Sequence, residues 1–158
     1  MSAIGPRSGP AKNQAGFSLA ELTVLLAVIG ALFALSLPAF LTYYQTAQVR
    51  GAASDIAAYV NLGRQLAIQQ NRSICVHIKP AAVHYHLNTT CTGQRWVGPG
   101  TAANGDIPAP DGIALTTTAD PVFTYLGAAA PAGTVTVTQG SRSLSVIVSA
   151  SGRVTIGP

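Results

Sequence analysis

Three histidines are the side chains of this sequence whose type and spacing come closest to a metal site: His77, His84 and His86. Imidazole nitrogens bind zinc and copper, and three of them on one face of a hairpin could hold such an ion. The plainer interpretation is an exposed polar face that happens to use histidine. We therefore expect no metal here, and keep the three histidines as weak candidates for one.

Two cysteines, Cys75 and Cys91, offer a second kind of chemistry. In an oxidising compartment they could form a disulfide, and the enclosed loop would then stabilise the fold by roughly 3 kcal/mol on the chain-entropy model. In a reducing compartment they would remain two buried thiols. The choice depends on the side of a membrane on which this part of the chain lies, and the N-terminal residues bear on that question.

The remaining polar residues do not form a catalytic pattern. The chain has only five acidic residues, and no two of them form a pair. The serines lack a nucleophile motif with an attendant His and Asp, and the sequence has no glycine-rich phosphate-binding loop. We therefore expect no enzyme and no cofactor.

An apolar segment from 17 to 41 dominates the N-terminal part of the chain. No residue from Leu22 to Leu41 is charged, and most of them are Leu, Ala, Val or Ile. A helix of this length rises about 30 Å, which matches the hydrocarbon thickness of a bilayer. The segment therefore predicts a transmembrane helix.

Basic and aromatic residues on the two flanks predict the orientation of this helix. Arg7 and Lys12 precede it with no acidic residue beside them, so that side is expected in the cytoplasm. Tyr43 and Tyr44 follow it and suit the opposite membrane–water interface, where the ring is buried and the hydroxyl is hydrated. The rest of the chain is then expected outside the cytoplasmic membrane.

A secretory signal peptide is the competing interpretation of the apolar segment. The apolar region of a signal peptide is usually about 7 to 15 residues long, and the present segment is longer. It also carries Glu21 at its start. A carboxylate in an apolar helix costs roughly 2.5–3.5 kcal/mol at the bilayer centre and less near its edge, so such a group usually has a partner. These features favour a membrane helix over a signal peptide.

Six residues resemble the processing motif of bacterial prepilins: Gly16-Phe17-Ser18-Leu19-Ala20-Glu21. The resemblance implies that a membrane peptidase removes the leader, 1–16, by cutting between Gly16 and Phe17, and that the new N-terminal Phe17 is methylated. It also implies that Glu21 pairs with the N-terminal amine of a neighbouring subunit, so that two charges near the bilayer edge neutralise each other. Pro38 matches the proline that interrupts the N-terminal helix in this family.

Removal of the leader changes the charge balance of the protein. The whole chain has a formal charge of +4, and loss of Arg7 and Lys12 leaves seven basic and five acidic residues, a balance of +2. Charged residues make up only 9% of the sequence. A balance so close to neutral predicts no general affinity for nucleic acid.

The pattern after the apolar segment predicts a fold of class α+β. Small and apolar residues recur at three- and four-residue spacing within 42–72, so the helix is expected to continue as an amphipathic helix to about Gln70. Alternating segments and turn residues predict an antiparallel β-domain over 73–158, packed on the helix, with a loop at 88–111 that Trp96 anchors. The predicted strands are Ile74–Lys79, Val83–Leu87, Ile113–Thr117, Val122–Leu126, Thr134–Thr138, Leu144–Ser149 and Arg153–Ile156.

The first two strands are expected to pair as a hairpin. With a four-residue loop, 80–83, Ile78 would lie opposite Tyr85 and His77 opposite His86. The remaining pairs would be Val76 with Leu87 and Lys79 with His84. This register places the apolar residues of both strands on one face and the three histidines on the other.

Short stretches of the β-domain resemble the GspH/FimT family of minor pseudopilins and minor pilins. They are Asn71-Arg72-Ser73-Ile74-Cys75, Cys91 with Trp96, Phe123-Thr124-Tyr125-Leu126-Gly127, Val146-Ile147-Val148 and Gly152-Arg153-Val154. The chain departs from the family after Trp96, where Val97-Gly98-Pro99-Gly100 replaces a more aromatic strand. The resemblance implies a type IV pilin-like fold, a single-pass position in the bacterial inner membrane with the C-terminal domain in the periplasm, and assembly with other pilins or pseudopilins.

Two functions follow from this resemblance. The first is a minor pseudopilin, a structural subunit of the type II secretion pseudopilus that prepilin peptidase processes and that assembles through its N-terminal helix. The alternative is a FimT-like minor type IV pilin that acts in pilus initiation or DNA uptake.

The resemblance also raises DNA binding at the end of the chain. Family members involved in DNA uptake have a basic Gly-Arg-x-Arg close, and the matching stretch here, 152–155, lacks the second arginine. Arg142 and Arg153 could still flank one another across the last strands and contact DNA. Otherwise these arginines are solvated or contact neighbouring subunits, because phosphate binding needs several such charges.

Overall fold

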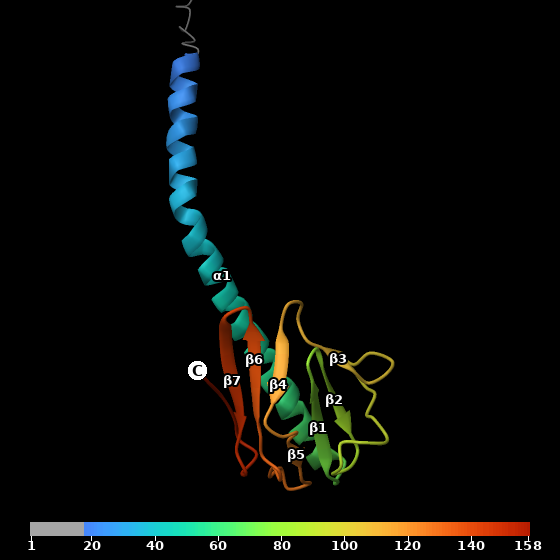
Figure 1. Cartoon of the computed structure of the whole chain (residues 1–158). Helices are drawn as coiled ribbons and strands as arrows, with labels where there is room; N and C mark the ends of the chain where they lie inside the picture. The colour runs from blue at the N-terminus through green and yellow to red at the C-terminus, as the bar shows by residue number, and fades with distance from the viewer. Residues whose placement is uncertain (1–17) are drawn as a thin grey trace, which may run out of the picture. The chain divides into compact units, whose positions relative to one another are not determined.

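The computed structural model describes residues 18–158, which form one long helix followed by eight strands (Figure 1). The chain divides into two compact units, and the boundary in the sequence lies between Phe40 and Leu41. The helix, α1, runs from Leu19 to Gln69. The strands are β1 (Ile74–Lys79), β2 (Ala82–His86), β3 (Ile107–Pro108), β4 (Ala114–Thr117), β5 (Val122–Phe123), β6 (Thr134–Gln139), β7 (Arg142–Val148) and β8 (Val154–Gly157).

The C-terminal end of α1 is a Schellman motif. The amide of Arg72 donates to the carbonyl of Ala67 at 3.1 Å, and the amide of Asn71 donates to the carbonyl of Ile68 at 3.3 Å. Asn71 has a φ of 48°, in the left-handed region that asparagine adopts more readily than most residues. The motif satisfies two terminal helix carbonyls and turns the chain into β1, close to the end that the sequence predicted.

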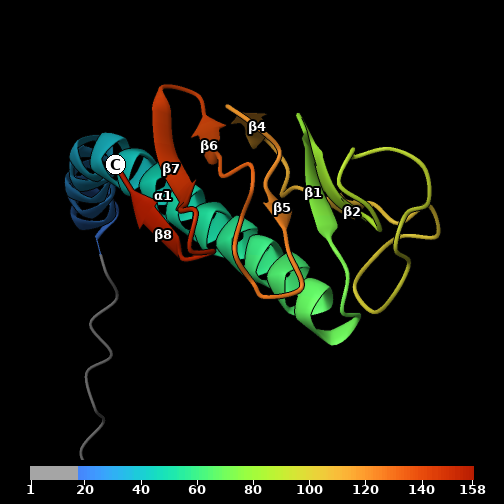
Figure 2. The ribbon, with the colours of Figure 1, turned by 90° about the horizontal axis from the view of Figure 1, so that it is seen from below.

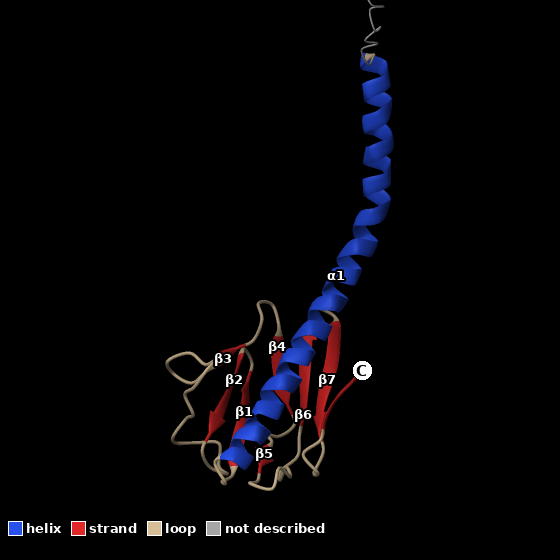
Figure 3. Ribbon diagram, turned by 180° about the vertical axis from the view of Figure 1, so that it is seen from behind, coloured by secondary structure: helices blue, strands red, loops and turns tan. Residues whose placement is uncertain are grey.

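The strands form two antiparallel sheets of four strands each. Their orders are β3-β2-β1-β5 and β4-β6-β7-β8. Seen from behind, the part of α1 that follows Leu41 covers one face of these strands (Figure 3), and the view from below shows the strands on one side of it (Figure 2). The hydrophobic core therefore lies between this part of the helix and the inner faces of the sheets.

Tyr85 is the largest fully buried side chain of the described residues and joins three parts of the second unit. Its hydroxyl donates to the carbonyl oxygen of Tyr59 in α1 at 2.8 Å. Its ring meets Trp96 edge to face, with the ring centroids 5.7 Å apart. Burial raises the pKa of the Tyr85 hydroxyl well above its usual range, so the group stays protonated as a donor. Trp96 is thus packed against the core at the place where the sequence predicts an anchor.

Gly63 lies where α1 approaches the first sheet most closely. A Cβ built at this position would overlap Cγ2 of Val76 and would lie 3.2 Å from Cε1 of Tyr85. Both neighbours are fully buried. The side-chain hydrogen of glycine therefore allows the helix and the sheet to touch at this point.

We expect Gly63→Ala to destabilise the protein by about 1–3 kcal/mol, because overpacking at the helix–sheet contact outweighs the helix propensity of alanine. Gly51→Ala is the matched control on the same helix, since a Cβ there meets nothing within 4 Å. That change should stabilise the protein by up to about 1 kcal/mol. Urea unfolding followed by the fluorescence of Trp96 measures both, and equal effects of the two changes would contradict the close approach.

The register of the first hairpin differs from the predicted one. Only two residues, Pro80 and Ala81, separate β1 from β2, and His77 lies opposite His84 instead of His86. The apolar partners shift by the same two positions, so Val76 faces Tyr85. Side-chain direction alternates with a period of two along a strand, and a shift of two positions leaves every side chain on its predicted face. The hydrophobic pattern therefore could not distinguish the two registers.

Two further strand predictions need correction. The predicted strand Val122–Leu126 is limited to β5, because the chain turns directly after Phe123: the amide of Gly127 donates to the carbonyl of Thr124 at 2.8 Å. The short strand β3 was predicted as part of a loop. It is a two-residue pairing with Ala82 and Val83 in β2, too short to leave an alternating pattern.

Candidate functional site

The first unit of the chain presents an apolar surface with an acidic residue at its start. The segment Leu19–Ser36 is long and apolar enough to cross a membrane, and none of it is buried. Leu19 is 82% exposed and Leu35 is 79% exposed. An exposed apolar surface of this size marks a contact with a membrane or with other chains.

The acidic residue, Glu21, lies in the first turn of α1 and is exposed. Ser18 precedes the helix as its N-cap, because its Oγ accepts a hydrogen bond from the amide of Ala20 at 3.3 Å and its carbonyl accepts one from Leu22 at 3.1 Å. Ser-x-x-Glu is the pattern of a capping box, and an acid is also favoured beside the positive end of a helix dipole. Glu21 thus lies at a position where an acid favours the start of a helix, and we did not predict this although the pattern is visible in the sequence.

Of the other residues predicted for processing and assembly, only Pro38 lies among the residues that the structure describes. The predicted cleavage site, Gly16 and Phe17, lies outside the described residues. Pro38 falls within the bounds of α1, which is assigned as one helix across this position.

The three predicted histidines do meet on one face of the first hairpin. The ring centroid of His84 lies 4.8 Å from that of His77 and 4.9 Å from that of His86. The face is not the exposed polar surface that the sequence suggested: His84 is 1% exposed and His86 is 4% exposed. Apart from Tyr85, whose hydroxyl donates to Tyr59, they are the buried side chains with polar groups among the described residues.

A disulfide holds the segment that buries these histidines. Cys75 in β1 is bonded to Cys91, with the two Cα atoms 5.2 Å apart. From Cys91 the chain returns along β2, where Arg95 forms an isolated bridge with His86. We call residues 87–106 the covering segment, because they extend from the end of β2 to the carboxylate of Asp106 beside His84.

Two carboxylates of the second unit lie against the histidine cluster. Asp106 Oδ1 is 3.1 Å from Nδ1 of His84, within ion-pair distance but not aligned as a hydrogen bond. Asp120 contacts Nδ1 of His77 and also accepts a hydrogen bond from the amide of Ile78 at 3.0 Å. No local pattern indicates these contacts, because each aspartate is more than twenty residues from the histidine that it approaches.

The environment keeps the two buried histidines neutral. Burial lowers the pKa of His84 to about 4, and the nearby positive charges of Arg95 and Lys79 contribute in the same direction. Burial also lowers the pKa of His86, followed by the effect of His77. At neutral pH both rings therefore carry a nitrogen with a free lone pair.

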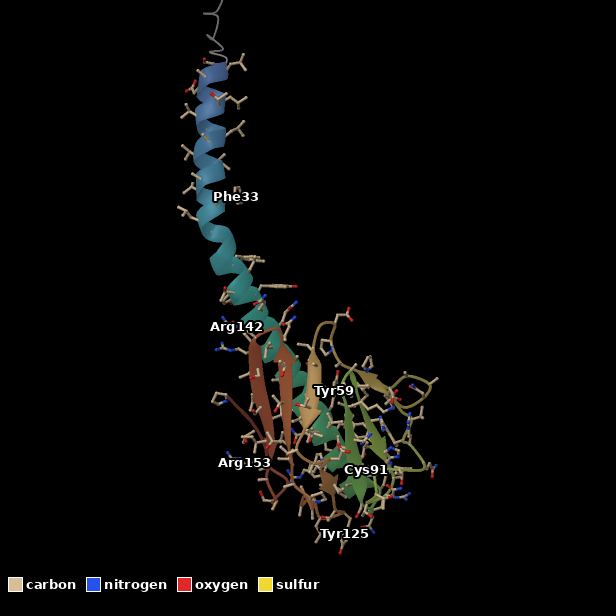
Figure 4. All side chains as sticks on the ribbon, in the orientation of Figure 1. Phe33, Tyr59, Cys91, Tyr125, Arg142 and Arg153 are labelled. Carbon is tan, nitrogen blue, oxygen red and sulfur yellow. A yellow bond between two sulfur atoms is a disulfide. The ribbon has the colours of Figure 1, made fainter. Side chains whose placement is uncertain are left out.

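The two arginines considered for DNA contact do not flank one another. Arg142 is the first residue of β7, whereas Arg153 precedes Val154, which pairs with Val148 at the other end of β7. Figure 4 shows the two side chains at opposite ends of that strand. Six steps of roughly 3.3 Å place these ends about 20 Å apart. The prediction that Arg142 and Arg153 flank one another was wrong, because it did not consider which end of β7 each residue lies near.

A family model described as Type II transport protein GspH matches residues 52–152, more than half of the chain. The chain belongs to the GspH family. The GspH match begins in the helix after Leu41 and ends at Gly152, so it includes both the histidine cluster and the disulfide.

Two solved structures resemble this GspH-family chain. The type IV minor pilin FimU of Pseudomonas aeruginosa has a TM-score of 0.51 and 16% identity, and the match covers 73% of this chain and 92% of FimU. The minor pseudopilin EpsH from the type 2 secretion system of Vibrio cholerae has a TM-score of 0.55 and 13% identity, with 69% and 95% covered. At these identities the likeness concerns the fold, and it confirms the predicted type IV pilin-like architecture.

Two relatives named fimbrial protein, both from Pseudomonas aeruginosa, share 32% identity with the GspH-family chain over 79 residues. The match covers 50% of this chain and 51% of each relative, so the chain spans about half the length of these relatives. Pilins and pseudopilins thus both occur among the proteins that this chain resembles.

Proposed function

We propose that this chain is a minor pseudopilin, a structural subunit that assembles into the pseudopilus of a type II secretion system. The observation that carries the proposal is the apolar surface of Leu19–Ser36, none of which is buried within the chain itself. A helix of this kind needs a bilayer before assembly and the helices of neighbouring subunits afterwards. Membership of the GspH family supports the secretion role.

The proposal includes processing of the N-terminus. Prepilin peptidase cuts between Gly16 and Phe17, and Phe17 is then methylated. The new N-terminus would be two residues before Leu19 in the sequence, and Glu21 supplies the opposite charge for the amine of a neighbouring subunit. Pro38 lies farther along the same assembly helix.

The proposed topology is a single pass through the bacterial inner membrane. The basic leader stays in the cytoplasm, and the β-domain lies in the periplasm. The disulfide between Cys75 and Cys91 supports this side of the membrane, because the periplasm is oxidising. The arrangement requires no enzymatic role for the chain.

The charge of Glu21 can be separated from the hydrogen-bonding capacity of its side chain by a conservative change. Glu21→Gln keeps a side chain that completes a capping box but removes the charge that would pair with an amine. We expect exoenzyme in the culture medium to fall when the gene is deleted, and to stay low when the deletion strain carries Glu21→Gln. The wild-type copy should restore secretion.

Asp55→Asn provides the matched control, because it removes an exposed carboxylate from the same helix within the second unit. This copy should restore secretion as well as the wild type does at equal protein levels. If Glu21→Gln also restores secretion, the acid serves only to cap the helix and the charge-pairing proposal is wrong. If deletion leaves secretion unchanged, the secretion role itself is wrong.

A minor pilin of a type IV pilus is the second candidate function. The likeness to FimU and to the two fimbrial proteins favours it. In that case deletion should reduce surface pili or transformation and leave exoenzyme secretion intact. A DNA-binding role receives no support from the wide separation of Arg142 and Arg153, and a gel shift at low salt without retardation would discard it.

A further inference from the structure

The buried histidines are an expensive feature of this domain. Burying a polar side chain costs free energy unless a partner compensates for the lost water. In the described part of the chain, Nδ1 of His84 is buried without an aligned hydrogen-bond partner, whereas His86 interacts with the backbone of Thr92 and Gly93. Two imidazole rings thus lie side by side in the core with incomplete compensation for the lost water, and their Nε2 atoms are the ones that face each other.

The inner nitrogens of the two rings are placed as ligands to one ion would be. Nε2 of His84 and Nε2 of His86 lie 3.1 Å apart. Two nitrogens bound to a tetrahedral zinc ion at about 2.0–2.1 Å are separated by roughly 3.3 Å. Without an ion, the same separation allows a single N–H···N hydrogen bond, which is the alternative that an experiment must exclude.

The outer nitrogens face the kind of group that orients metal-binding histidines. A histidine that binds a metal through one nitrogen usually offers the other to a carboxylate or carbonyl, which fixes the ring. Asp106 lies 3.1 Å from Nδ1 of His84, and Asp120 contacts Nδ1 of His77. The Nε2 atoms of these two histidines are thereby left for a ligand.

The charges around the cluster permit a divalent cation. Arg95 and Lys79 are the basic groups close to His84, and Asp106 and Asp120 are the acidic ones. Arg95 is itself 3.5 Å from Asp106, so part of its charge is already compensated. Asp106 and Asp120 place two negative charges beside the rings, which offset part of the positive charge of Arg95 and Lys79.

We propose that His84 and His86 bind a divalent transition metal ion, zinc in the first place, through their Nε2 atoms, with His77 as the third ligand. The ring of His77 lies 4.8 Å from that of His84 and 6.0 Å from that of His86, which makes it the third imidazole of the cluster, and its ring has to turn toward the ion to bind it. Imidazole ligands select zinc, copper and nickel over magnesium and calcium. The ion would lie beneath the covering segment and, together with the disulfide, hold it against the sheet.

Zinc uptake by the full chain in detergent, produced without a histidine tag and stripped with chelator, tests the proposal. Equilibrium dialysis should show one zinc ion per wild-type chain. His84→Gln and His86→Gln should each abolish this uptake, and Asp106→Asn should weaken it by roughly 10- to 100-fold. Asp111→Asn is the control, because it removes an exposed carboxylate that lies outside the cluster.

Electron spin resonance of Cu²⁺ bound to the wild-type chain is a second test, and it does not depend on whether the variants fold. The chain contains only three histidines, so nitrogen coupling from two or three imidazoles would assign the ion to this cluster. Absence of zinc and copper uptake by the wild type would overturn the proposal, as would copper bound without imidazole coupling. Unchanged uptake by His84→Gln and His86→Gln would overturn it as well.

Discussion

Replacement of Gly152 by alanine is expected to destabilise the β-domain by roughly 3 kcal/mol or more. Gly152 has a φ of 76°, a conformation that costs an alanine about 1–2 kcal/mol. A Cβ at this position would also overlap the carbonyl oxygen of Gly127, and a backbone atom cannot rotate out of the way. Urea unfolding of the chain in detergent, followed by the fluorescence of Trp96, measures the loss.

Gly140→Ala separates the two causes of this loss. Gly140 also has a positive φ, 59°, but a Cβ there meets nothing within 4 Å. Its replacement should therefore cost only the conformational part, about 1–2 kcal/mol. Equal losses for the two changes would show that the contact with Gly127 is not tight, and would contradict this packing.

The contact at Gly152 brings together two stretches of the chain that are distant in the sequence. The turn that contains Gly127 and the turn that contains Gly152 lie against one another, and the amide of Ala129 donates to the carbonyl of Ala150 at 3.0 Å. A Cβ at either glycine would also approach Nε of Arg64 in α1. These glycines allow two turns and the helix to pack closely.

Removal of the disulfide, as Cys75→Ala with Cys91→Ala, is expected to destabilise the protein by about 3 kcal/mol. The bond spans a sequence separation of 16 residues, and its loss gives the unfolded chain more conformations. The covering segment also loses its attachment to β1. Thermal unfolding of the metal-free protein in chelator should show a midpoint lower by roughly 10 °C or more.

A reducing agent provides the control for this change without any substitution. It should lower the unfolding midpoint of the wild type by a similar amount and leave that of the double variant unchanged. If the wild-type midpoint does not move although both thiols are titrated as free, the disulfide does not stabilise the fold. A fall in the double variant on reduction would point to an effect of the reagent elsewhere.

The long N-terminal helix could be predicted from the sequence, because the patterns that indicate it are local. A long uncharged run, a prepilin-like motif and the stop at Asn71-Arg72-Ser73 each depend on residues within a few positions of one another. Helical hydrogen bonds join residues four apart, so the same short range determines the structure. The helix start at Ser18, with the pattern Ser-x-x-Glu, could also have been predicted in this way.

Most of the strands could also be predicted from the sequence, but the register in which they pair could not. Alternation identifies which face of a strand is apolar, and it placed Val76 and Tyr85 on the apolar face, where both are buried in the structure. It cannot identify the partner of each residue, because every shift of two positions preserves the faces. The turn of Pro80 and Ala81 decided the register, and with it the position of His77 opposite His84.

The sequence by itself determined the fold class, the family and the residue types of the candidate sites. Only the tertiary structure decided that His84 and His86 are buried, that Asp106 and Asp120 lie against the cluster, and that Arg142 and Arg153 are far apart. The physical reason is that these facts depend on contacts between segments distant along the chain. Such contacts arise from the packing of the whole domain, and a local sequence pattern does not determine them.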